Sequence, residues 1–130
     1  MQKDFEAWNK LKTRLDAIKS PPLFNDREIW WCSVGINVGY EVYGKGDLFS
    51  RPVLIIKKQS TDTFIGLPMS TRLKQRSDYY HSEFNGKNVA FMLGEIRKFD
   101  SRRLSDKMGK ISQNKFEAIK NAILKNFQPQ

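Results

Sequence analysis

The apolar run PVLII, residues 52–56, constrains the fold of this chain more than any other segment. It is rich in β-branched residues and ends at Lys57 and Lys58, which predicts a buried β-strand. Pro52 has no N–H for a neighbouring strand, so it belongs at the first position of the strand or on a sheet edge. The residue before a proline favours an extended backbone. Arg51 is therefore held stiffly at the mouth of the strand, either as a charge that caps it or as a guanidinium that faces an anion.

Further short runs with strand character surround this one and are separated by turn signals. We expect strands over residues 27–34, 63–71, 78–84 and 88–93, and a short strand or a bend at 95–99. Asn85-Gly86, between two of these runs, is a strong signal for a β-hairpin. Five or six short strands followed by a C-terminal helix predict a mainly β, α+β chain built on a small antiparallel barrel.

An amphipathic helix is predicted at each end of the chain. In residues 3–19 the apolar side chains recur every three or four positions, and Ser20-Pro21-Pro22 ends the helix. These side chains are Phe5, Trp8, Leu11, Leu15 and Ile18. Near the C-terminus, Ser112 is the expected N-cap of a helix whose apolar face contains Phe116, Ile119, Ile123 and Phe127.

We divide the chain into an N-terminal helix with a Pro-Pro hinge, residues 1–22, and a main domain, residues 23–130. The first helix is expected to pack on the domain, where it would cover an exposed edge, or on a partner, where it would serve oligomerisation. The length of 130 residues and a hydrophobic content of 39% allow one domain with one modest core.

Several function classes are made improbable by what the sequence lacks. No apolar run approaches the roughly 18 residues of a membrane span, and the N-terminus lacks the apolar region of a signal peptide. The one cysteine, Cys32, cannot form an internal disulfide and is expected to be a buried structural thiol. The one histidine, His81, argues against a zinc site built from histidines. We therefore expect a cytoplasmic protein without membrane contact, metal or cofactor.

Charge indicates the kind of partner. The chain has 23 Lys and Arg residues against 14 Asp and Glu, which gives a net charge of +9. A small domain this basic favours polyanions, most often nucleic acid, with an acidic protein partner and simple solubility as the alternatives. The long loop over residues 35–50 combines glycines with Tyr40 and Tyr43, and tyrosine rings offer a surface on which bases stack.

Five motifs occur in the order found in one known family. They are REIWW at 27–31, GYE at 39–41, SRPVLIIKK at 50–58, LPMST at 67–71 and GEIRKFDSRRL at 94–104. Together, over about residues 27–127, they resemble the PemK/MazF-like toxins of bacterial toxin–antitoxin modules. The resemblance implies an SH3-like, partly open β-barrel that forms a homodimer. The N-terminal helix lies outside it.

The resemblance also implies an activity. Members of this family are endoribonucleases that cut single-stranded RNA such as mRNA without a metal, leaving a 2′,3′-cyclic phosphate and a 5′-hydroxyl. A cognate antitoxin covers the RNA site with an acidic, disordered segment, and the pair binds DNA together. Two alternatives stay open: a non-catalytic RNA-binding barrel, and a toxin of the same fold that poisons a protein target such as DNA gyrase.

The resemblance assigns the catalytic roles to Arg51 and Ser70. A fixed arginine can stabilise the charge that builds on the phosphate oxygens when the RNA 2′-hydroxyl attacks, and a neighbouring hydroxyl can donate a further hydrogen bond. The candidate substrate-binding residues are Tyr40, Glu41, Thr71, Arg72, Lys74 and Arg97. Arg72 and Arg97 have surface ion pairs as their alternative role.

No general base is evident in the sequence. His81 titrates near neutral pH, but the family pattern does not point to it. Glu95 stands where relatives carry glutamine, and Gly94 stands where several carry an acid, so this end of the site departs from the pattern. We expect Glu95 to be structural and Asp100 to orient a neighbouring arginine. Trp30, Trp31 and Phe91 are expected to be core or dimer residues rather than platforms for bases.

Overall fold

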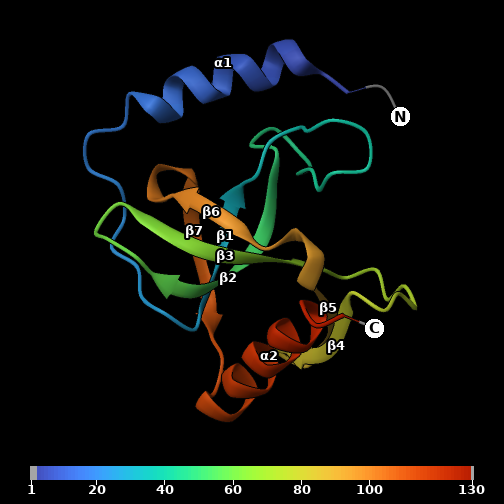
Figure 1. Cartoon of the computed structure of the whole chain (residues 1–130). Coiled ribbons are helices and arrows are strands. Elements are labelled where there is room, and N and C mark those ends of the chain that lie inside the picture. Colours follow the sequence, from blue (N-terminus) through green and yellow to red (C-terminus); the bar gives the residue numbers. More distant parts are fainter. Residues whose placement is uncertain (1–2, 130) are drawn as a thin grey trace.

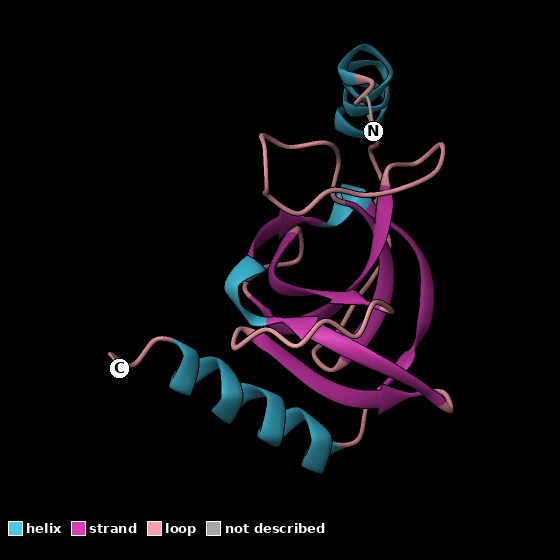
Figure 2. Cartoon of the chain, turned by 90° about the vertical axis from the view of Figure 1, so that its right-hand side faces the viewer, coloured by secondary structure: helices cyan, strands magenta, loops and turns pink. Residues whose placement is uncertain are grey.

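The strands form one strongly curved antiparallel sheet, which the computed structural model describes together with two helices over residues 3–129 (Figure 1). In chain order the elements are α1 (Phe5–Asp16), β1 (Glu28–Ser33), β2 (Ser50–Lys58), β3 (Thr63–Ser70), β4 (Tyr79–Phe84), β5 (Lys87–Met92), η1 (Leu93–Glu95), β6 (Arg97–Asp100), η2 (Ser101–Arg103), β7 (Leu104–Lys110) and α2 (Gln113–Asn126). Hydrogen-bonded neighbours follow the order β4-β5-β3-β2-β1-β7, and β6 pairs with β3. The sheet curls without closing, with α1 and α2 on opposite sides (Figure 2). This confirms the predicted partly open barrel.

The PVLII run is continuous in its apolar character because β2 is buried on both faces. Val53, Leu54 and Ile55 are each fully buried, and β2 lies between β1 and β3. Leu54 belongs to the core that α2 covers, whereas Val53 and Ile55 belong to a second core around Phe24 and Phe64. Each face of a central strand needs apolar side chains, so the usual alternation is lost.

Helix α1 is shorter and less buried than predicted. Asp4 caps its N-terminus, with Oδ1 accepting a hydrogen bond from Ala7 N at 2.9 Å. Trp8 and Leu11 are buried, but Phe5 and Ile18 are 50% and 37% exposed. Only the middle of the helix is buried, against Ile36 and Phe49 of the segment between β1 and β2, so the ends of its apolar face stay in solvent.

Helix α2 begins where it was predicted. Ser112 Oγ accepts from Lys115 N at 3.2 Å as the N-cap, and Phe116, Ile119 and Ile123 are buried against the sheet. Phe127, expected on the same face, is 68% exposed because the helix ends at Asn126. No helix within residues 3–129 is long and apolar enough to cross a membrane.

One turn and one strand show where the sequence was informative and where it was not. Asn85 and Gly86 both have positive φ, +53° and +76°, as the tight turn between β4 and β5 requires. Strand β7, residues 104–110, was not predicted. Within the described part of the chain it pairs with β1 alone, at the end of the sheet, so most of its side chains are exposed and polar and carry no apolar alternation.

Glu28 is a buried charged residue on β1, and we predict that it contributes to stability. Its carboxylate accepts from Asn25 N at 2.8 Å and Trp30 Nε1 at 3.0 Å and lies 2.9 Å from Lys107 Nζ. Burial alone would raise the pKa of Glu28, but these hydrogen bonds and the Lys107 charge outweigh it and lower the pKa below 4.5. Glu28→Gln should cost about 1.5–3 kcal/mol, the usual worth of hydrogen bonds to a charged group.

The lowered pKa of Glu28 determines the pH range in which this side chain stabilises the fold. A carboxylate with a lowered pKa stabilises the fold above its ordinary pKa, and this contribution disappears as the pH falls through the folded value. Urea unfolding of Glu28→Gln should therefore differ most from the parent protein above about pH 5 and least in acid. Glu6→Gln, on the exposed surface of α1, is the matched control. A difference in the free energy of unfolding between Glu28→Gln and the parent protein that stays constant down to about pH 3 would contradict this account.

Candidate functional site

Strands β2 and β3 part at the end of the barrel that carries the predicted site. Their last paired residues are Val53 and Pro68. Beyond that point β2 continues beside β1, with Arg51 opposite Cys32, and β3 continues beside β5, with Ser70 opposite Ala90. Figure 1 shows β2 and β3 leaving this fork in different directions. Arg51 and Ser70 therefore stand on its two branches, each two residues, or about 7 Å of strand, from the last pair.

Arg51 is fixed by the main chain. Its Nε and Nη2 both donate to the Tyr43 carbonyl oxygen, at 3.1 and 3.0 Å. The side chain is half-buried, and the rest of its guanidinium has no hydrogen-bond partner within residues 3–129. Burial lowers the pKa of Arg51 from its ordinary value, and the Arg72 charge adds to this, whereas Tyr79, Tyr43 and Glu95 act in the opposite direction. Arg51 stays charged at neutral pH because arginine titrates far above it.

Ser70 ends β3 and is buried, with 8% of its surface exposed. Its Oγ accepts a hydrogen bond from Arg72 N at 3.1 Å, which holds the hydroxyl at the point where the chain leaves the strand. The hydroxyl proton has no acceptor among the described residues, so it can be donated to a ligand.

Two loops flank the fork and carry most of the predicted substrate-binding residues. The β1–β2 loop, residues 34–49, presents Tyr40 at its tip with the ring fully exposed. Glu41 lies beside it and accepts from Val38 N at 2.8 Å, so its carboxylate shapes the loop. The β3–β4 loop, residues 71–78, presents Thr71, Arg72 and Lys74, which are all exposed. Of these, Arg72 is close enough for its charge to act on Arg51.

Other sequence candidates lie elsewhere or have structural contacts. Arg97 is exposed on β6 with its guanidinium 4.7 Å from the Phe99 ring centre. His81 is two strands from Ser70, about 10 Å across the sheet, and its Nε2 lies 2.9 Å from Lys74 O. Glu95 Oε2 accepts from Val42 N at 3.3 Å, which ties η1 to the β1–β2 loop.

Expectations about four residues, Asp100, Cys32, Trp30 and Phe91, are confirmed. Asp100 orients an arginine, since its carboxylate accepts from Arg102 N at 2.9 Å and from Arg102 Nη1 at 3.3 Å. Cys32 is fully buried, and burial raises the pKa of its thiol to about 12. A thiol with this pKa is protonated at neutral pH and is a poor nucleophile. Trp30 and Phe91 are core residues, whereas Trp31 is 39% exposed.

Two tyrosines at the site were not predicted in these roles. Tyr43 contributes its carbonyl oxygen, and a main-chain atom leaves no signature in the side-chain pattern. Tyr79, at the start of β4, raises the pKa of Arg51 through the charge of its ionised phenol, and the sequence predicted it only as part of a strand. Its position at the end of a basic loop, after Arg72, Lys74 and Arg76, was the signal that could have indicated it.

The chain is thus a small open barrel with a fixed arginine at a strand fork, flanked by a glycine-rich loop and a basic loop. Residues 25–127 match the sequence model of the PemK-like, MazF-like toxins of type II toxin–antitoxin systems. This chain belongs to that family. No curated protein matches it significantly by sequence.

Solved structures share the fold at low sequence identity. MazF from Deinococcus radiodurans superposes with a TM-score of 0.65 at 15% identity, over 81% of this chain and 96% of that one. A mycobacterial endoribonuclease, solved in complex with its cognate antitoxin, superposes with a TM-score of 0.55 at 14% identity, over 84% of this chain and 99% of that one.

Proposed function

We propose that this protein is a metal-independent endoribonuclease, the toxin of a toxin–antitoxin pair. One observation carries the proposal: the half-buried Arg51 guanidinium is held by two hydrogen bonds to Tyr43 O, across the fork from Ser70. A cation that is fixed before the substrate arrives stabilises developing charge without reorganisation. Family membership and the endoribonuclease among the similar structures support this function.

The reaction that suits these residues uses the nucleophile of the RNA itself. The 2′-hydroxyl loses its proton and bonds to the adjacent phosphorus, the bond from phosphorus to the 5′ oxygen breaks, and that oxygen takes up a proton. The products are a 2′,3′-cyclic phosphate and a 5′-hydroxyl. Negative charge grows on the non-bridging oxygens, where the N–H groups of Arg51 not bound to Tyr43 and the hydroxyl of Ser70 would donate.

The two flanking loops suit the binding of single-stranded RNA. The exposed Tyr40 ring can stack on a base, and Arg72 and Lys74 can pair with phosphates. Glu41 and Thr71 stand beside them at the edges of the fork. Arg97 stays a prediction as a substrate contact, and so does the homodimer.

Digestion of a long single-stranded RNA in the presence of a chelator tests the proposed function. We expect cleavage products that carry 2′,3′-cyclic phosphate and 5′-hydroxyl ends. RNA binding without any cleavage would favour the non-catalytic barrel. Neither binding nor cleavage, together with inhibition of a DNA gyrase, would favour a toxin with a protein target.

Ser70→Ala should slow cleavage by roughly tenfold, which is less than the effect of changing Arg51. One hydrogen bond to a charged group is worth about 1.5–3 kcal/mol, and Thr71 is next to the lost hydroxyl. Single-turnover cleavage of a labelled oligonucleotide measures the loss. Ser105→Ala on β7, whose hydroxyl donates to Trp31 O, is the matched control. A Ser70→Ala rate equal to that of the parent protein would leave Ser70 a structural residue.

An acidic antitoxin should bind the face that binds RNA, since a net charge of +9 attracts both polyanions. Its binding should weaken as salt rises, because released counterions drive part of the affinity. Competition between the cognate antitoxin and a 2′-deoxy oligonucleotide, which cannot be cut by this route, measures the overlap. Simultaneous binding without mutual weakening would contradict a shared face.

A further inference from the structure

Helix α1 lies outside the region matched by the family and yet contacts the loop that leads to Arg51. The Trp8 indole fills the space that a side chain at position 35 would need. A Cβ atom built on Gly35 would lie 2.2 Å from Trp8 Cζ2, and the φ of Gly35 is +86°. The same indole meets the Phe49 ring edge-on at 5.7 Å between centroids. Trp8 therefore contacts both the start and the end of the β1–β2 loop.

The loop backbone converges directly beneath this indole. Gly35 N donates to Phe49 O at 3.0 Å, and Gly44 N donates to Gly35 O at 2.7 Å. Three points of the loop, its start, its middle and its end, are thus joined at Gly35. Gly44 directly follows Tyr43, whose carbonyl holds Arg51, and Phe49 lies two residues before Arg51. Trp8 therefore packs on a junction that adjoins both the acceptor, Tyr43 O, and the donor, Arg51.

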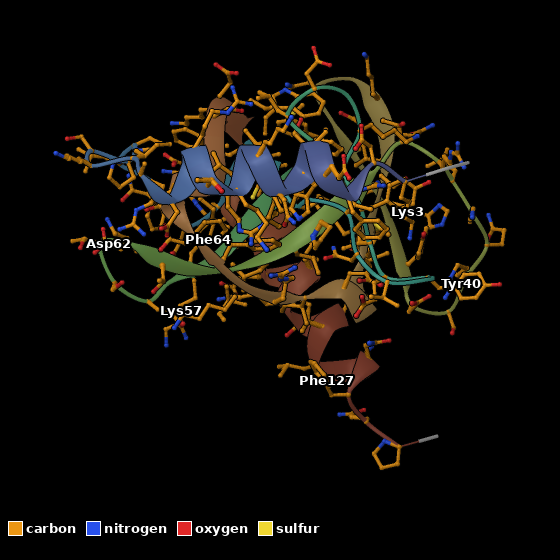
Figure 3. All side chains as sticks on the ribbon, turned by 90° about the horizontal axis from the view of Figure 1, so that it is seen from above. Lys3, Tyr40, Lys57, Asp62, Phe64 and Phe127 are labelled. Atoms are coloured by element: carbon orange, nitrogen blue, oxygen red, sulfur yellow. The ribbon has the colours of Figure 1, made fainter. Side chains whose placement is uncertain are left out.

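Lys3 ties the N-terminal end of α1 to the outer part of the same loop. Its Nζ donates to Asn37 O at 2.8 Å and to Gly39 O at 3.0 Å, and it lies 5.4 Å from the centre of the Tyr43 ring. Figure 3 looks down on α1 and shows Lys3 at the end of the helix that is nearer to Tyr40, whose ring points away from the barrel.

Two arginines of η2 also contact Trp8 and the segment that follows α1. Arg102 Nε, on η2, donates to Ile18 O at 3.1 Å just beyond the helix. Arg103 places its guanidinium 5.5 Å from the Trp8 ring centre and donates to Ser33 O at 2.9 Å. Residues of η2 therefore hold Trp8 and the segment after α1, while Trp8 and Lys3 contact the β1–β2 loop, which is the arrangement of a clamp.

We propose that Trp8 and Lys3 are positioning residues for Arg51, and that α1 clamps the β1–β2 loop so that Tyr43 O stays in place to hold the guanidinium. A helix that only covers an exposed edge would affect the stability of the whole domain but not the order of this loop. The cleavage readout rests on the proposed ribonuclease function. The structural readout, the exchange of the Arg51 Nε–H proton, does not.

Point variants in the full chain test the clamp. We compare Trp8→Ala, the conservative Trp8→Phe, and Lys3→Met, which keeps most of the stem and removes the ammonium. Lys10→Met, at an exposed position of α1, is the control for loss of charge, and Ile123→Ala, in α2, is the control for a hole in a core away from the loop. NMR measures hydrogen exchange at Arg51 Nε and at the amides of Gly35, Gly44 and Ser50, and thermal melting measures global stability.

Trp8→Ala and Lys3→Met should each speed exchange at these protons by about tenfold or more, the effect expected of local opening. They should lower kcat for RNA cleavage by roughly tenfold, within the 10²-fold that a displacement of about 1 Å can cost. KM should change little, whereas a lysine that simply binds phosphate would raise KM. Trp8→Phe should recover most of both losses, and Lys10→Met and Ile123→Ala should leave loop exchange close to that of the parent protein.

If hydrogen exchange at Arg51 Nε and at the loop amides is unchanged in Trp8→Ala, the clamp is overturned. It is also overturned if these protons exchange faster while kcat for RNA cleavage stays at the parent value. A parent protein that cuts no RNA would overturn the proposed function instead. The exchange of Arg51 Nε–H would then decide the clamp by itself: faster exchange in both variants would support it, and parent-like exchange would refute it.

Discussion

Arg51→Lys should reduce single-turnover cleavage of RNA at least ~100-fold while the barrel stays folded. Removal of a comparable charge-stabilising donor typically costs about 10²–10³ in rate, or about 3–4 kcal/mol. Arg51 uses Nε and Nη2 to hold Tyr43 O and can direct its other N–H groups at a phosphate. A lysine ammonium is a compact charge on a flexible stem, so it cannot be anchored on the carbonyl and reproduce the planar fork at the same time.

RNA binding should change much less than the rate, because many other basic residues contribute to attraction of the phosphates. The measurement is the cleavage rate of one labelled oligonucleotide at saturating enzyme, with thermal melting of each variant. Arg14→Lys, at an exposed position of α1, is the matched control and should cut at the parent rate. A folded Arg51→Lys protein with nearly the parent rate would leave Arg51 as a charge at a strand end.

The fold could be predicted to the extent that local pattern and burial agree. Three local patterns each predict a single structure, and each prediction is confirmed. They are the apolar run at 52–56 for a buried strand, Asn85-Gly86 for a tight turn and Ser112 for a helix N-cap. Strand β7 has no such signal, because a strand at the end of the sheet needs few apolar side chains. The exposure of Phe127 depends on where α2 ends, which the spacing of apolar residues does not fix.

The candidate site could be predicted only in part, because side-chain patterns carry no information about main-chain partners. The sequence predicts Arg51 and Ser70 as site residues, which stays a prediction, and the strands bring both to one fork. It did not indicate that Tyr43 O holds the guanidinium, since any residue at position 43 offers a carbonyl. Nor did it indicate that Trp8 rests on Gly35, because this contact joins residues 27 positions apart and depends on how α1 folds back.

Gly44→Ala should abolish most of the cleavage activity without unfolding the barrel. A Cβ atom at this position would lie 1.8 Å from Phe49 O and 2.0 Å from Phe49 C, which are backbone atoms that cannot rotate away. The β1–β2 loop would have to open, and the hydrogen bond from Gly44 N to Gly35 O would be lost. Because Tyr43 immediately precedes Gly44, its carbonyl would move away from Arg51. We expect a loss of about 10²-fold in kcat, the cost of displacing a catalytic group by about 1 Å.

Gly46→Ala is the control for this effect, since the two glycines are in the same loop and receive the same substitution. A Cβ atom on Gly46 would meet nothing within 4 Å, and its φ of +74° means that alanine brings only the strain of a left-handed backbone, about 1–2 kcal/mol. Gly46→Ala should therefore cut RNA within a few-fold of the parent rate and melt at a slightly lower temperature. Because residues 44–46 belong to neither of the two barrel cores, Gly44→Ala should melt no earlier than Gly46→Ala by more than a few degrees. Equal kcat values for the two variants would mean that the path of the loop around Tyr43 does not determine the activity of Arg51.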